Sequence, residues 1–168
     1  MKKQKGFSLI ELLIVVAIIL IIAAIAIPNL MRSRMLAHEA SAVNSMRTIN
    51  TAQVTYSSTF GQGYAAGLGN LSTPAGGCGV PSAALACLLD SNLGSGTKSG
   101  YAFTSVGSNG AGTTISPFVD FNSTANPIVP GSSGQRTLCS DASGVIRGDP
   151  TGAPAPVVCG TSGLAPIQ

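Results

Sequence analysis

The strongest pattern in the chain is an uninterrupted apolar run close to its N-terminus. Residues 12–27 comprise seven Ile, three Leu, two Val and four Ala. At about 1.5 Å of rise per residue, a helix over residues 7–27 covers roughly the 30 Å hydrocarbon thickness of a bilayer. The twelve large aliphatic side chains favour insertion by about 0.3 to 0.6 kcal/mol each. The pattern therefore predicts a membrane-spanning helix.

Beyond this run the apolar positions take the three- and four-residue spacing of an amphipathic helix, with no Gly or Pro over residues 29–60. The positions expected on its buried face are Leu36, Ala40, Val43, Met46, Ile49, Gln53 and Tyr56. The positions expected on its polar face are Arg32, Arg34, His38, Glu39, Ser45, Arg47 and Asn50. Glycines at 61 and 63 predict the end of this stem. Pro28 lacks an amide hydrogen, so we expect a kink or an opened turn there.

Residues 61–168 have the pattern of a turn-rich β domain. They contain most of the twenty-one glycines and nine of the ten prolines. Runs rich in β-branched or aromatic residues and bounded by turn residues predict strands over 101–106, 113–121 and 135–139. Pro117 limits the middle run to an edge or bulged strand.

Two shorter elements are expected in the same region. The sequence Asp-Ala-Ser-Gly at 141–144, followed by Val-Ile-Arg, predicts a turn into a short strand, so residues 135–147 are expected to form a hairpin. A short helix is expected over residues 82–89, ahead of the sheet.

The four cysteines all follow the apolar run, at Cys78, Cys87, Cys139 and Cys159. An even number in a domain outside the cytoplasm indicates disulfides, and three pairings are possible. We favour sequential pairing, Cys78 with Cys87 and Cys139 with Cys159, because each bond closes a local loop. A loop of about 15 residues closed in this way gains on the order of 3 kcal/mol. No C-x-x-C spacing exists and the sole histidine, His38, lies on the stem, so we expect no metal site.

One carboxylate, Glu11, lies at the start of the apolar run, after a basic leader and the pair Gly6-Phe7. A charge at the centre of a bilayer costs about 2.5 to 3.5 kcal/mol, so this residue is a functional candidate. Three simpler interpretations exist: a cleaved secretory signal with an A-x-A-like site at residues 24–26, a plain signal anchor, and a capping box over residues 8–11. None of them requires glycine directly before an aromatic residue.

The leader Met-Lys-Lys-Gln-Lys-Gly followed by Phe-Ser-Leu-Ile-Glu resembles the prepilin signal of type IV pilins and of type II secretion pseudopilins. The resemblance implies cleavage between Gly6 and Phe7 by a prepilin peptidase, methylation of the new N-terminus at Phe7, and pairing of Glu11 with the Phe7 amine of a neighbouring subunit. Pro28 also matches the family. A bond between Cys139 and Cys159 would resemble the C-terminal disulfide loop of many type IV pilins.

The expected fold is α+β, a long stem helix packed on a small antiparallel sheet and stapled by disulfides. The expected parts are a removed leader at residues 1–6, a transmembrane and filament-core helix at 7–28, an amphipathic half-stem at 29–60, and a globular head at 61–168. The expected function is a structural subunit of a type IV pilus-like filament for surface adhesion or motility. The alternatives are a type II secretion pseudopilin, or a minor pilin that binds a surface or DNA.

The net charge and the composition of the chain limit the classes of partner that we expect. The net charge of +3 disappears with the three leader lysines, since six basic and six acidic residues remain. The remaining cations are scattered, so we expect no direct nucleic-acid binding. No catalytic cluster is present, and we expect neither enzyme activity nor a cofactor. The expected partners are other copies of the chain, the prepilin peptidase and an inner-membrane assembly platform. The expected location is the inner membrane with a cytoplasmic N-terminus, followed by the extracellular filament.

Overall fold

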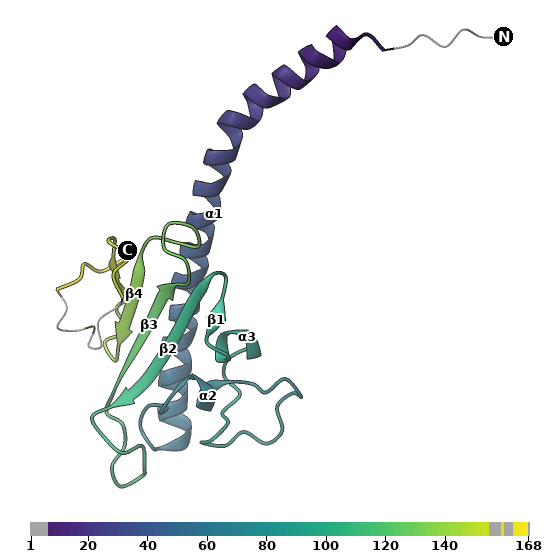
Figure 1. Ribbon diagram of the computed structural model, residues 1–168. Coiled ribbons are helices and arrows are strands. Elements are labelled where there is room, and N and C mark those ends of the chain that lie inside the picture. The colour runs from purple at the N-terminus through teal and green to yellow at the C-terminus, as the bar shows by residue number, and fades with distance from the viewer. Residues whose placement is uncertain (1–6, 155–158, 160–162, 168) are drawn as a thin grey trace. The chain divides into compact units, whose positions relative to one another are not determined.

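The computed structural model describes residues 7–154, 159 and 163–167. The chain divides into two compact units, Met1–Arg34 and Met35–Gln168. The long helix α1, Leu9–Phe60, belongs to both units, and every strand described belongs to the second (Figure 1). The leader expected at residues 1–6, including Gly6, lies outside the described residues.

Both ends of α1 follow from local sequence. At the start, the Ser8 N–H donates to Oε2 of Glu11 at 2.9 Å, which is one half of a capping box. At the end, Gly61 takes a positive φ of 65°, a conformation that glycine adopts without steric cost and that commonly terminates helices. The helix continues through Pro28, and a bend at that residue stays a prediction.

The second unit is built on a five-stranded antiparallel sheet with the order β1-β2-β3-β4-β5. Its strands are β1 Thr97–Lys98, β2 Tyr101–Ser108, β3 Asp120–Pro127, β4 Thr137–Asp141 and β5 Arg147–Asp149. Two one-turn helices, α2 Leu68–Leu71 and α3 Ser91–Gly94, precede the sheet. Neighbouring strands are consecutive in sequence, so successive connections lie at opposite ends of the sheet (Figure 1). The expected α+β fold is confirmed, as is the hairpin, which is formed by β4 and β5.

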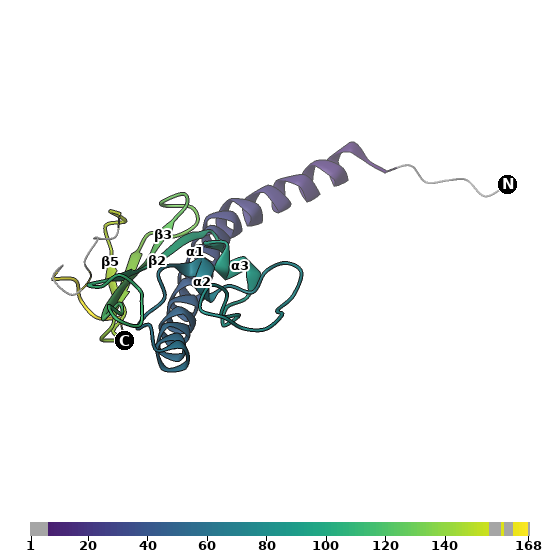
Figure 2. The ribbon, with the colours of Figure 1, turned by 90° about the horizontal axis from the view of Figure 1, so that it is seen from below.

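The core lies between the sheet and the C-terminal half of α1, which run side by side in both ribbon views (Figures 1 and 2). The helix contributes Ala42, Met46, Ile49, Ala52 and Tyr56, all buried. The sheet and its connections contribute Tyr101, Phe103, Ala125, Leu138 and Ile146, also buried. This packing explains why the second half of the stem is amphipathic, whereas the first half is apolar on every side.

Two expected elements are wrong. The strand expected over residues 113–121 is mostly a loop, and β3 instead begins at Asp120. The expected helix over residues 82–89 is a tight turn, in which Ser82 and Leu85 exchange backbone hydrogen bonds of 3.0 and 2.9 Å. The reason for the first error is that β3 is largely polar. Its central polar side chains form cross-strand hydrogen bonds that the sequence pattern does not reveal, such as the 2.8 Å contact between the Ser105 and Ser123 hydroxyls.

The division of the stem into an apolar and a polar face is also partly wrong. Leu36 and Ala40 are exposed, because the described core begins two residues later on α1. Ser45 and Asn50, expected on the polar face, are buried. The Asn50 Nδ2 donates to the Ser140 hydroxyl at 2.8 Å, which satisfies the nitrogen of this buried amide.

Candidate functional site

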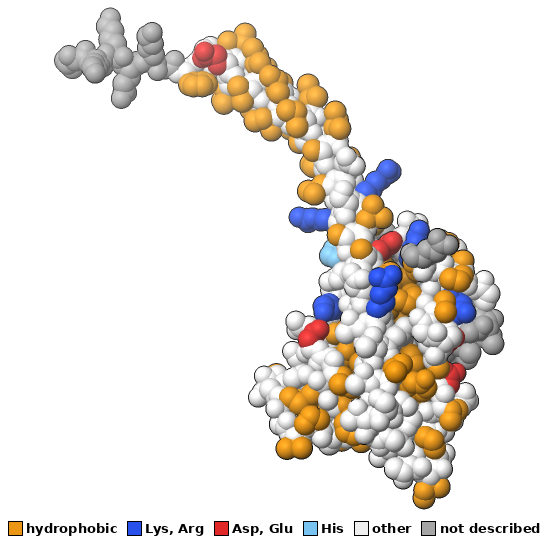
Figure 3. All heavy atoms as spheres, turned by 180° about the vertical axis from the view of Figure 1, so that it is seen from behind, with side chains coloured by type: hydrophobic (Ala, Val, Ile, Leu, Met, Phe, Trp, Pro, Cys, Tyr) orange, Lys and Arg blue, Asp and Glu red, His pale blue; other side chains and the backbone are white. Residues whose placement is uncertain are grey.

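Figure 3 shows hydrophobic side chains along most of the visible face of α1 in the first unit. From Phe7 to Arg34 every side chain is exposed except that of Ala23, which is half-buried. Phe7 itself is 83% exposed. By length and composition α1 is a helix that could cross a membrane. A contiguous exposed apolar surface of this size marks a site for lipid or for another protein.

Glu11 is the one carboxylate within this surface, since the next acidic residue along the chain is Glu39. Its Oε2 accepts the Ser8 N–H, so the first turn of α1 fixes the position of the carboxylate. No described ion pair involves Glu11. The structure therefore presents an exposed carboxylate on an apolar surface, four residues after Phe7, the N-terminal residue that the expected cleavage would create.

A second carboxylate, Glu39, fastens the sheet to the stem. Its Oε1 accepts the N–H groups of Gln135 and Arg136 at 2.8 and 3.2 Å, and its Oε2 lies 3.9 Å from the Arg136 Nε. The side chain is only 16% exposed. Sequence reasoning placed Glu39 on a solvated face, because nothing in the local pattern indicates that a connection ninety-six residues away supplies two donors.

The contact between Glu39 and Arg136 influences the pKa of a buried tyrosine, Tyr101. The Tyr101 hydroxyl donates to the Arg136 carbonyl at 2.9 Å, and the whole residue is inaccessible to solvent. Burial raises the pKa of Tyr101 to about 12, and the negative charge of Glu39 contributes to the rise, while Arg136 opposes it. Tyr101 therefore stays neutral over the whole physiological range.

Gln53 joins the stem to the middle of the sheet. The residue is fully buried. Its Oε1 accepts the Ala65 N–H at 2.7 Å, and its Nε2 donates to the Ser105 hydroxyl at 2.9 Å. Ser105 in turn contacts the Ser123 hydroxyl at 2.8 Å. Because each of these polar side chains has a partner, the hydrogen-bond network fixes the register of α1 against β2 and β3.

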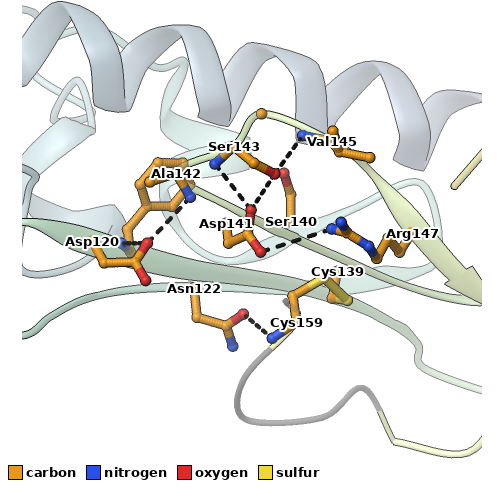
Figure 4. Close-up of polar contacts among 12 residues, drawn as sticks. Asp120, Asn122, Cys139, Ser140, Asp141, Ala142, Ser143, Val145, Arg147 and Cys159 are labelled. Atoms are coloured by element: carbon orange, nitrogen blue, oxygen red, sulfur yellow. Dashed lines mark hydrogen bonds and ion pairs between the residues drawn. A yellow bond between two sulfur atoms is a disulfide. The ribbon is translucent and has the colours of Figure 1, made fainter. Parts of the chain in front are cut away.

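Two disulfides close loops of the second unit, Cys78–Cys87 and Cys139–Cys159. This is the sequential pairing that we favoured from the sequence. Cys139 and Cys159 are both fully buried. Figure 4 shows the Asn122 side chain of β3 accepting the Cys159 N–H, at 3.2 Å, which holds the end of this loop against the sheet.

Charged groups around that loop contact one another and the backbone of turns. The Arg147 Nη1 lies 3.8 Å from Oδ2 of Asp141, and Oδ1 of Asp120 accepts the Ala142 N–H at 3.2 Å (Figure 4). Within the described residues, no three His, Cys, Asp or Glu side chains are grouped so that they could hold a metal ion. The described head therefore offers structural polar contacts.

Comparison with known proteins identifies the N-terminal region. Residues 1–27 match the family model described as the prokaryotic N-terminal methylation motif. The chain is 44% identical over 54 residues to the type IV major pilin protein PilA of Myxococcus xanthus. It is 59% identical over 39 residues to the type IV wide pilus major component PilA4 of Thermus thermophilus.

These similarities cover 32% and 23% of this chain, and 24% and 30% of the two relatives. The chain thus spans less than a third of the length of either curated relative. No solved structure matches the chain. The methylation motif and the two relatives support the type IV pilin family and confirm the resemblance seen in the leader and the apolar helix.

Proposed function

We propose that this chain, which matches the prokaryotic N-terminal methylation motif over residues 1–27, is a structural subunit of a type IV pilus-like filament. The observation that carries the proposal is the exposed apolar part of α1 with one carboxylate in its first turn. A helix that is apolar on all sides needs lipid around it before assembly and other helices around it afterwards. Both environments exclude water, so both make the position of Glu11 important.

In this proposal a prepilin peptidase cuts between Gly6 and Phe7 and the new amine of Phe7 is methylated. The three leader lysines keep the N-terminus cytoplasmic until cleavage, and the head lies outside. An assembly platform in the inner membrane then adds subunits to a filament that extends from the cell surface. Attachment or motility would follow from the exposed surfaces of the heads.

Glu11 selects the correct register during assembly. Its carboxylate meets the positive Phe7 amine of the neighbouring subunit, which neutralises both charges inside an apolar bundle. Leaving one member of a buried pair without its partner costs about 3 to 5 kcal/mol. A subunit inserted out of register would incur that penalty, and the pair would therefore act mainly on specificity.

Two substitutions at Glu11 separate charge pairing from helix capping. Glu11→Ala removes both the charge and the acceptor for the Ser8 N–H, whereas Glu11→Gln removes the charge and keeps an acceptor. We expect both variants to be cleaved and to enter the membrane, and neither to form normal fibres. Normal fibres from Glu11→Gln would assign the residue to capping instead.

Processing is tested separately on the wild-type protein. We expect the intact mass of the protein from a sheared-fibre fraction to match a chain that begins at methylated Phe7. We expect its N-terminal peptide to begin at the same residue. A chain that begins at Ile27 would instead identify an ordinary secretory signal and contradict the filament model.

A further inference from the structure

We propose that heads stack along the filament by inserting the exposed Ile128–Val129 turn of one head into a cavity at the opposite end of the next head. This inference rests on the proposed filament function and adds the contact between heads. The partner is a second copy of this chain. All residues concerned belong to the second compact unit.

The turn is held rigidly although its tip is uncovered. The Val129 carbonyl accepts the N–H groups of Ser132 and Ser133 at 3.1 and 2.9 Å, and the Ser133 hydroxyl accepts the Val129 N–H at 3.0 Å. A side chain at Gly134 would collide with the Tyr101 ring, so the turn also packs closely on the core. Ile128 and Val129 are nevertheless each 54% exposed. An ordered apolar tip of this kind loses little entropy when it binds.

The cavity lies where α1 ends. Its volume is about 250 Å³, and its lining includes Tyr56, Gln62, Tyr64, Asn70, Ala84 and Phe118. None of the residues that line it is charged. The hollow is therefore suited to one or two uncharged side chains.

Its aromatic wall is fixed in place. The Phe118 ring lies so close to Gly107 and Gly112 that a side chain at either position would collide with it. The Tyr64 N–H donates to the Phe118 carbonyl at 3.0 Å, and the Tyr64 ring packs edge-on against Phe121 at 4.8 Å. The receiving surface is therefore preformed, as the turn is.

The two surfaces occupy opposite ends of the head. Antiparallel order places the β2–β3 connection, which includes Phe118, at one end of β3, and the β3–β4 connection, which includes the turn, at the other (Figure 1). The eight residues of β3 separate them by about 27 Å, at about 3.4 Å per residue of an antiparallel strand. The helix gives the same result, because Glu39 bonds the residues after the turn while Tyr56 lines the cavity. Because the turn and the cavity lie at opposite ends of the head, insertion of one into the other gives a head-to-tail contact. Such a contact repeats into an open fibre.

Charges beside the two ends are complementary. Arg136 follows the turn. Its Nε lies 3.9 Å from Oε2 of Glu39, and its side chain is still 54% exposed, so it can also contact an acid of a second copy. Asp120 lies two residues beyond Phe118, and no described ion pair involves it. The turn and the cavity are both uncharged, with a base, Arg136, beside the turn and an acid, Asp120, beside the cavity. This arrangement favours a second copy of the chain over an anionic lipid surface as the partner.

Site-specific photocrosslinking tests the contact in assembled wild-type-like fibres. With p-benzoylphenylalanine in place of Ile128, irradiation should join subunits, and the adduct should map to residues 62–70, 84 or 118 of the second copy. The reciprocal probe at Ala84 should map to residues 127–134 and serves if the first variant does not assemble. Adducts elsewhere, adducts to lipid, or no intermolecular adduct in intact fibres would overturn the contact while leaving the filament function standing. Absence of fibres from the wild-type chain would instead overturn the filament function and this contact with it.

A substitution pair provides a second test. Val129→Ser should reduce the ratio of subunit in fibres to unassembled subunit in the membrane by up to about tenfold. This is the factor expected when an interface no longer buries one aliphatic side chain. Val54→Ser is the matched control, since Val54 is 58% exposed on α1 and belongs neither to the turn nor to the lining of the cavity. Equal fibre yields from the two variants would contradict the proposal.

Discussion

Gln53 offers the sharpest test of how the stem is held against the sheet. We consider Gln53→Ala. The change removes hydrogen bonds of 2.7 and 2.9 Å and leaves the buried Ala65 N–H and the Ser105 hydroxyl without that partner. Each lost bond costs about 1 kcal/mol, a buried donor left unpaired costs about 1 to 3 kcal/mol, and the vacated volume adds to this. We expect a loss of about 4 kcal/mol in the free energy of unfolding.

The assay is thermal unfolding of the full chain in detergent micelles with its disulfides intact, followed by near-ultraviolet circular dichroism. The chain has no Trp, and its three Tyr all lie in the second unit, so the signal reports on the head. A loss of about 4 kcal/mol corresponds to a decrease in Tm of roughly 8 to 16 °C for a chain of this size. A double-mutant cycle with Ser105→Ala should give a coupling of about 1 kcal/mol.

The control is Gln135→Ala, because the Gln135 side chain is exposed and only its backbone N–H is used by Glu39. We expect that variant to change stability by less than about 0.5 kcal/mol. If Gln53→Ala unfolded at the same temperature as Gln135→Ala, the buried network would contribute nothing, and the reasoning would be refuted.

Two further predictions concern the head. Replacing Cys139 and Cys159 by Ser should lower Tm more than replacing Cys78 and Cys87, because the former pair is fully buried and closes a loop of 20 rather than 9 residues; equal losses by calorimetry would contradict this. Burial raises the pKa of Tyr101 to about 12, above the ordinary value of 10, so the folded state holds the proton more tightly. Stability should therefore fall as pH rises from about 10 to 12, and the loss should shrink in Tyr101→Phe; an unchanged loss in that variant would refute the assignment.

Periodicity was a sound guide where burial alone decides the structure. The apolar run predicted the first half of α1, and the three- and four-residue spacing predicted its continuation to Phe60. The glycines at 61 and 63 marked its end correctly, since positive φ at both positions favours glycine. The same reasoning failed for β3, where Asn, Ser and Thr occupy a central strand and carry no apolar alternation.

Some residues of the candidate site could likewise be predicted from the sequence, and others could not. The leader motif pointed to Phe7 and Glu11 because it depends on residues adjacent in sequence. Glu39, the cavity at the end of α1 and the Ile128–Val129 turn had no such signal. Each depends on partners far away in the chain, such as the Gln135 N–H for Glu39.

The sequence by itself determined the stem, the α+β class and the exposed carboxylate at the start of the helix, because these follow from local hydrophobicity, helix propensity and short motifs. Only the tertiary structure decided which polar residues are buried, where the sheet begins on the stem, and which loops share one end of the head. Those outcomes depend on pairings between distant segments, in which a polar side chain such as Gln53 is accommodated only because its partners arrive from elsewhere in the fold.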